Sequence, residues 1–154
     1  PYAVCRLLFR KGNPAGRGEI AGTATTRRMN GWFGGGPIPD LPRDEDVISE
    51  ADLARYGDSL TRNTFFGPDS YYMNHERNRA YAAETPDARL NMPVLFVHAA
   101  YDYTCETLTS RLAEPMRQQC DILTEETIES GHWIAQERPA EVNDALSRWL
   151  GRIV

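Results

Sequence analysis

An aspartate and a histidine follow two strand-like stretches of the sequence. Asp102 comes shortly after the apolar run 94–99, and His132 comes just after the shorter strand-like stretch 122–128. In parallel α/β sheets, functional groups converge in the loops at the carboxyl ends of the strands. An imidazole moves a proton near neutral pH, and a carboxylate can fix its tautomer and stabilise the imidazolium. The order of acid first and base second therefore fits the last two members of a nucleophile–acid–base triad.

Spacing alone leaves a plainer interpretation open, in which Asp102 is a turn residue and His132 is a loop histidine with a water partner.

Motifs for a bound cofactor or metal are weaker than this pair. The stretch 16–22 is one residue too long for a dinucleotide-binding loop and follows no clear strand. No closely spaced pair of zinc ligands occurs among the candidates His98, Cys105, Cys120 and His132. We therefore expect no cofactor and no metal.

The elements that must position these two residues are visible in the hydrophobic pattern. The continuous apolar run 94–99 is typical of a parallel strand covered by helices on both faces. A shorter strand is predicted over 122–128, with a helix between the two strands over 107–119 that is irregular at Pro115. A last helix is predicted from Pro139, because apolar residues then repeat at helical spacing. This order of elements indicates an α/β core.

The first half of the chain has a different character. Helical spacing over residues 1–10 gives way to a long Gly/Pro-rich loop over 12–43. Ser49 is a predicted helix cap, and a further helix is predicted from about Ser70 to Ala83, where Thr85-Pro86-Asp87 breaks it. We interpret residues 1–85 as a helical lid and residues 86–154 as the C-terminal half of an α/β core.

Two β-α units alone cannot complete a parallel sheet, because each strand needs neighbours for its backbone groups. The remaining strands are expected before Pro1, and a start at Pro rather than Met within an apolar stretch agrees with a truncated start. A missing N-terminal half of the core is therefore an expected partner of this chain. The oligomeric state stays open.

Composition excludes several classes of function. The 154 residues carry 17 basic and 22 acidic side chains, a formal net charge of −5, which argues against nucleic acid as a partner. No apolar run approaches the roughly 20 residues that a membrane span requires, and the first residues lack the basic start and the long apolar stretch that are typical of a signal peptide. The three cysteines are odd in number and form no C-x-x-C pair, which favours reduced thiols in the cytoplasm.

Several of these stretches together resemble the soluble epoxide hydrolase branch of the α/β-hydrolases. The C-terminal part of that branch is similar to 92–102, to Ser130-Gly131-His132-Trp133 and to the helix start 138–143. Its lid helix, in which a tyrosine precedes an Asn-x-Glu-Arg-Asn segment, is similar to 71–78. Another lid segment is similar to 6–10. The tyrosine with its Asn-x-Glu-Arg-Asn segment is the most specific of these signals.

The resemblance implies a role for each matching residue. It assigns Asp102 as the orienting acid, His132 as the base that activates water, and Tyr72 as a lid hydroxyl that hydrogen-bonds the epoxide oxygen. Tyr71 takes that place if the register is one residue off, and Trp133 either lines the substrate cavity or packs against the final helix. A phenol is suited to this task, because the alkoxide released from a strained ring is strongly basic.

The chain departs from the family pattern in its nucleophile. The family uses an aspartate in a Gly-x-Asp-x-Gly elbow, whereas 67–70 lacks the second glycine and precedes a lid helix. There is no His-Gly-x-Pro oxyanion segment, and the second lid tyrosine is also expected before Pro1. Without a nucleophile the covalent step cannot occur, so these residues alone are expected to be inactive.

The resemblance thus implies an epoxide hydrolase that turns a small-molecule epoxide into a vicinal diol through a covalent ester and needs no cofactor. Two alternatives stay open. One is another lidded α/β-hydrolase, with a serine nucleophile for esters or a halide-binding tryptophan for haloalkanes. The other is a non-catalytic fragment or a protein that binds an apolar small molecule without turnover.

Overall fold

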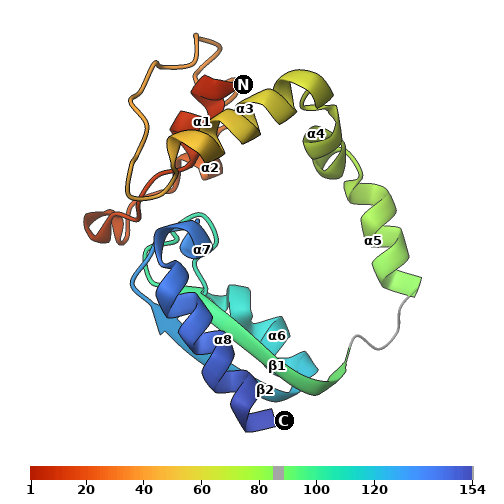
Figure 1. The fold of residues 1–154 in the computed structure, drawn as a ribbon. Helices are drawn as coiled ribbons and strands as arrows, with labels where there is room; N and C mark the ends of the chain where they lie inside the picture. The colour runs from red at the N-terminus through yellow and green to blue at the C-terminus, as the bar shows by residue number, and fades with distance from the viewer. Residues whose placement is uncertain (85–88, 154) are drawn as a thin grey trace.

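The computed structural model of the chain describes residues 1–84 and 89–153. The part before the gap, here called the helical segment, carries α1 (Tyr2–Leu8), α2 (Gly22–Thr25), α3 (Glu50–Asn63), α4 (Phe66–Tyr72) and α5 (His75–Glu84) (Figure 1). The part after it, the β/α segment, carries β1 (Leu90–Ala99), α6 (Glu114–Gln119), β2 (Cys120–Ile128), α7 (Ile134–Glu137) and α8 (Pro139–Ile153). The predicted boundary at 85/86 and the predicted helix break at 85–87 lie outside the described residues.

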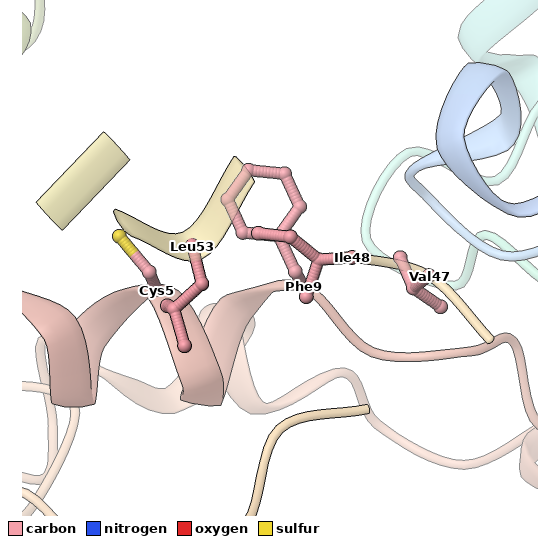
Figure 2. Packing of buried hydrophobic residues seen from close by; sticks show 5 residues of the cluster. All are labelled: Cys5, Phe9, Val47, Ile48 and Leu53. Atoms are coloured by element: carbon pink, nitrogen blue, oxygen red, sulfur yellow. The ribbon is translucent and has the colours of Figure 1, made fainter. Parts of the chain in front are cut away.

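The core of the helical segment forms where α1 packs against α3. Figure 2 shows its side chains, which come from α1 and the residue that follows it, from the chain just before α3 and from α3 itself. The partly buried Trp133 of the β/α segment packs against the same cluster. The core therefore reaches across both segments. Its buried members are Cys5, Phe9, Val47, Ile48 and Leu53.

Helix α3 starts as the sequence predicts. The hydroxyl of Ser49 accepts the backbone N–H of Asp52 at 3.1 Å, and a cap of this kind stabilises a helix by about 1 kcal/mol. Gly57 then lies against the aromatic ring of Tyr2, where a Cβ atom would stand 2.6 Å from the nearest ring carbon. A glycine at this position allows α1 and α3 to approach closely.

The long loop over 12–43 is confirmed, since it contains just a short 3₁₀ turn (Pro14–Gly16) and the four-residue α2. The single helix predicted from Ser70 to Ala83 is wrong, because α4 ends at Tyr72 and α5 begins at His75. The side chain of Asn74 explains the break. Its amide donates to the carbonyl of Ser70 at 3.0 Å, in place of the backbone N–H that a continuous helix would use.

The two strands form the predicted parallel pair. Residue Val94 lies opposite Leu123 and Ala99 opposite Ile128, with one irregularity between Leu90 and Pro93. Helix α8 packs against both strands, and α6 packs against β2 (Figure 1). Residues 93–97 of β1 are half-buried in the described structure, where α8 packs against the strand.

The helix predicted over 107–119 is shorter than expected. Helical structure begins with a 3₁₀ turn at Arg111–Ala113 and continues as α6. The preceding residues are held instead by the carboxylate of Glu106, which accepts three backbone N–H groups from residues 108–110. Burial works against ionisation of this carboxyl, but the hydrogen bonds outweigh it and lower its pKa. Pro115 starts α6 rather than disturbing it, because the first helical turn has no need of its N–H.

No helix among the described residues is both long enough and apolar enough to cross a bilayer.

Candidate active site

Asp102 and His132 face each other in the structure. The Oδ2 atom of Asp102 lies 2.9 Å from Nδ1 of His132. The other carboxylate oxygen, Oδ1, accepts the backbone N–H groups of Thr104 and Cys105 at 3.1 and 3.0 Å. One oxygen thus holds the aspartate in its own loop while the other orients the imidazole. A proton on Nδ1 directed at the carboxylate leaves Nε2 free to accept a proton.

The sheet register brings these two residues together. Beyond the end of the strands, the backbone N–H of Ala100 donates to the carbonyl of Ile128, and that of Tyr101 donates to Ser130, both at 2.9 Å. The loop after β1 therefore runs beside the loop after β2. Asp102 stands on the first loop and His132 on the second, and the side chains are 13% and 47% exposed. The imidazole is thus accessible, whereas the carboxylate that orients it is covered.

The residues 129–133, here called the base loop, pack against the end of α1. The indole N–H of Trp133 donates to the carbonyl of Leu8 at 2.6 Å, and its ring stacks at 4.3 Å on Phe9. The indole also stands edge-on to His132, with ring centroids 5.1 Å apart. The sequence analysis considered that Trp133 packs against the final helix. In the structure it packs instead against the core of the helical segment. The side chain next to the base is thereby fixed in position.

The two tyrosines of α4 are placed differently. Tyr72 is 65% exposed, and its ring packs edge-on against that of Tyr71 at 5.3 Å. Among the described residues, no hydrogen bond, ion pair or ring contact joins either tyrosine to Asp102 or His132. The structure therefore brings Asp102, His132 and Trp133 together, whereas no described contact brings the two tyrosines to them.

Comparison with known proteins relates the chain to a family. No family model matches the sequence. Bifunctional epoxide hydrolase 2 of Rattus norvegicus is 30% identical over 113 residues, which are 73% of this chain and 20% of that protein. Epoxide hydrolase A of Mycobacterium tuberculosis is 34% identical over 108 residues, which are 67% of this chain and 32% of that protein. The chain belongs to the epoxide hydrolases of the α/β-hydrolase family.

Solved structures agree on the fold. Epoxide hydrolase A from Mycobacterium thermoresistibile matches with a TM-score of 0.69 at 24% identity, over 98% of this chain and 46% of that chain. A mutant epoxide hydrolase of Vigna radiata matches with a TM-score of 0.62 at 21% identity, over 98% of this chain and 53% of that chain. The α/β-hydrolase fold is thus shared. The chain spans about a fifth to a third of the length of the curated relatives above.

A third side chain lies beside the pair in this member of the family. Ligand atoms of Asp102, Cys105 and His132 all lie within 4.8 Å of one another, a group that could hold a metal ion. Partial burial of the thiol and the charge of Asp102 raise the pKa of Cys105. The carboxylate and the imidazole already pair with each other, so the arrangement is that of an acid–base couple. Cys105 stands three residues after the acid, and that short spacing is the signal by which sequence reasoning could have found it.

The hydrogen-bond partners of two buried polar side chains behind the site were not predicted from the sequence. His98 is buried, with Nδ1 2.7 Å from the hydroxyl of Thr107 and Nε2 2.9 Å from the carboxylate of Glu125. The guanidinium of Arg117 and then this histidine lower the pKa of Glu125. His98 therefore ties the loop that carries Asp102 to β2. A second such group is Glu137, which is buried beside the base loop. The sequence around His98 and around Glu137 contains no pattern that predicts their hydrogen-bond partners.

A cavity lined mainly by charged side chains lies elsewhere. It has a volume of about 540 Å³ and opens between the end of β2 and α8, with a lining of charged side chains that includes Glu126, Arg138 and Arg148. Neither Asp102 nor His132 lines it. Apolar substrates are bound in cavities with mostly apolar walls, so we do not propose this charged cavity as the substrate-binding site.

Proposed function

We propose that the protein is an epoxide hydrolase in which His132, oriented by Asp102, activates water. The observation that carries the proposal is the 2.9 Å contact between Nδ1 of His132 and Oδ2 of Asp102 at the adjoining ends of two parallel strands. The sequence likeness to two named epoxide hydrolases supports the choice of reaction. Esters or haloalkanes would use the same acid and base with a different nucleophile or leaving-group site, and no described contact favours them.

The proposed reaction has two steps. A carboxylate nucleophile, expected before Pro1, attacks an epoxide carbon; the ring C–O bond breaks, and the alkoxide takes a proton from a lid phenol. Nε2 of His132 then removes a proton from water, whose oxygen bonds to the ester carbonyl carbon. The ester C–O bond breaks and the imidazolium protonates the departing oxygen. The proton of the resulting carboxylic acid returns to the phenolate, so that one water and one epoxide become one vicinal diol.

We propose Tyr72 as that phenol, with Tyr71 beside it and Trp133 as contacts of the substrate. Residues 1–85 would then serve as the lid, and residues 86–154 as the C-terminal part of a core completed by the N-terminal half. The division into a helical and a β/α segment supports these limits, and the edge-on packing of Trp133 beside the base supports its role. For Tyr72 the support is the resemblance of its surroundings to the family's lid helix. We place the protein in the cytoplasm, which its three free cysteines support.

Isotope labelling of the complete protein tests the chemistry. In ¹⁸O water, a single turnover through an ester leaves the diol unlabelled, because the new diol oxygen comes from the enzyme carboxylate. Repeated turnovers then label the diol. Label in the first turnover would mean direct attack by water and would overturn the covalent route.

Substitution of the base tests its role. His132→Ala should let the ester form but not break, so that the alkylated enzyme accumulates and is visible by mass spectrometry. The matched control is His75→Ala, which removes an exposed histidine of α5 and should leave turnover unchanged. Turnover that survives His132→Ala would remove this residue from the mechanism.

A further inference from the structure

A buried carboxylate joins the two segments directly behind the base. Glu137 is the last residue of α7, and its Oε2 atom accepts the backbone N–H of Gly12 at 3.0 Å and that of Gly131 at 2.9 Å. Gly12 belongs to the helical segment, and Gly131 immediately precedes His132. A charged acceptor strengthens both hydrogen bonds, and burial makes either donor costly to leave without a partner. We call this arrangement the Gly12–Glu137–Gly131 clamp.

The two glycines of the clamp touch through their backbones. A Cβ atom on Gly12 would lie 2.4 Å from the nitrogen of Gly131, and a Cβ atom on Gly131 would lie 2.6 Å from Cα of Gly12. Distances this short exclude any side chain at either position unless the backbone moves. The approach of the two chains and the carboxylate that bridges them therefore depend on each other.

The clamp completes a set of contacts that hold His132 from both neighbours. On one side, Gly131 is bound to Glu137. On the other, Trp133 donates to the carbonyl of Leu8 and stacks on Phe9. Asp102 orients the ring of His132, but its described side-chain hydrogen bonds include none to the backbone of the base loop. The stretch from Leu8 to Gly12 thus supplies the fixed support for that backbone.

We propose that Glu137 is a positioning residue, which clamps Gly12 of the helical segment to Gly131 and so sets the position of His132 for the attack of water. The inference rests on the proposed function, since it concerns the step that needs the base. Formation of the ester needs no proton transfer to His132, whereas breakdown of the ester does. Loss of the clamp should therefore slow one step of the two, which general damage to the fold would not do.

Pre-steady-state kinetics of the complete protein with a chromogenic epoxide measure both steps. Glu137→Ala should lower the rate of ester breakdown by about 10- to 100-fold, because a misplacement of a reacting group by about 1 Å can cost about 100-fold. Ester formation should stay within about 3-fold of wild type. Glu137→Gln keeps an acceptor oxygen and should recover part of the loss. The control Glu141→Ala removes an exposed carboxylate from the start of α8 and should change neither step. Equal slowing of both steps, or no slowing, would overturn the proposal.

A pair of glycine substitutions tests the close approach without touching the carboxylate. Gly12→Ala places its methyl group against the backbone of Gly131 and should reproduce the selective loss of ester breakdown. Gly22→Ala is the matched control, because a Cβ atom there meets nothing within 4 Å. A Gly12→Ala protein with normal ester breakdown would contradict a support role for this contact.

Amide hydrogen exchange separates this inference from the reaction itself, since it needs no substrate. In Glu137→Gln and Glu137→Ala proteins, peptides that contain Gly12 and Gly131 should both exchange faster than in wild type, by a larger factor for alanine. Absence of epoxide turnover in the wild-type protein would defeat the proposed function while coupled exchange at both glycines still established the clamp. Unchanged exchange at either glycine would defeat the clamp, whatever the activity.

Discussion

The end of α1 and helix α4 belong to the same helical segment, but they relate to the candidate site in different ways. Residues 8–12 touch the base loop through a backbone carbonyl, an aromatic ring and a bridging carboxylate. Helix α4 carries the two tyrosines on its exposed surface, without a described bond to the pair of Asp102 and His132. One part of the proposed lid therefore helps to build the base, and the other is available to meet a substrate. A lid of this kind is not one functional unit.

The largest expected effect concerns the pair that the end of α1 supports. Asp102→Asn keeps the size of the side chain but lets its amide donate to Nδ1, which favours the wrong tautomer of His132. We expect kcat to fall on the order of 10³- to 10⁴-fold, as measured in steady-state assays of the complete protein. Asp144→Asn on the exposed side of α8 is the control and should leave kcat unchanged. A fall below 10-fold would show that the pair is not the reactive centre.

Substitution of two phenylalanines tests whether the end of α1 is packed more firmly than α4. Phe9→Ala removes a buried ring that stacks on both Tyr56 and Trp133, so we expect unfolding free energy to fall by about 3 kcal/mol or more. Phe66→Ala removes a ring of α4 that is 80% exposed and should change stability by less than about 0.5 kcal/mol. Urea titration of both variants measures the difference. Equal losses would mean that α4 is as firmly packed as the end of α1.

Substitution of a tyrosine of α4 should affect the reaction but not the stability of the fold. Tyr72→Phe removes a hydroxyl from an exposed ring, so unfolding free energy should stay within about 0.5 kcal/mol of wild type. Loss of a proton donor to the epoxide oxygen should slow ester formation by about 100-fold or more. Tyr71→Phe is the matched control. A larger loss in Tyr71→Phe would shift the assignment by one residue, and no loss in either would remove α4 from the chemistry.

The smallest effect is expected away from the contact between the segments. Because the pKa of Glu125 is lowered from its ordinary value of 4.5, its ionised form stabilises the fold at all pH values above 4.5. That contribution is lost as pH falls through the lower pKa of the folded state. Glu125→Gln should thus reduce stability by less than about 1 kcal/mol at pH 7, with no difference in strong acid. Denaturation curves across this pH range test it, and a difference that grows in acid would contradict the sign.

The parallel strands and the last helix could be predicted because their signals are local. An apolar run and a repeat at helical spacing stand in the sequence itself, and the topology of parallel strands then places Asp102 and His132 in adjoining loops. The break at Asn74 depends on a side chain that takes a backbone acceptor four residues earlier, which hydrophobic spacing does not reveal. The late start of α6 also depends on a side chain, since the carboxylate of Glu106 accepts backbone N–H groups of the preceding residues.

The support behind the base could not be predicted, because it depends on partners far apart in the chain. Glu137 meets the backbone of Gly12 across 125 positions, and nothing in the residues around either one specifies the other. His98 reads as part of an apolar strand, whereas it bonds to Thr107 and Glu125 in the fold. The hydrophobic pattern of the sequence predicts which helices and strands form. Which polar side chains bond to one another depends on contacts between residues far apart in the chain.

The thiol of Cys105, close to the acid that orients the base, has a consequence for the chemical durability of the site. Oxidants and electrophiles attack the thiolate form of cysteine, and the raised pKa leaves little of that form at neutral pH. The residue is exposed, so access alone would make it a target. The negative charge of Asp102 adds to this protection, and so the carboxylate that we propose as the orienting acid also shields its neighbour from alkylation.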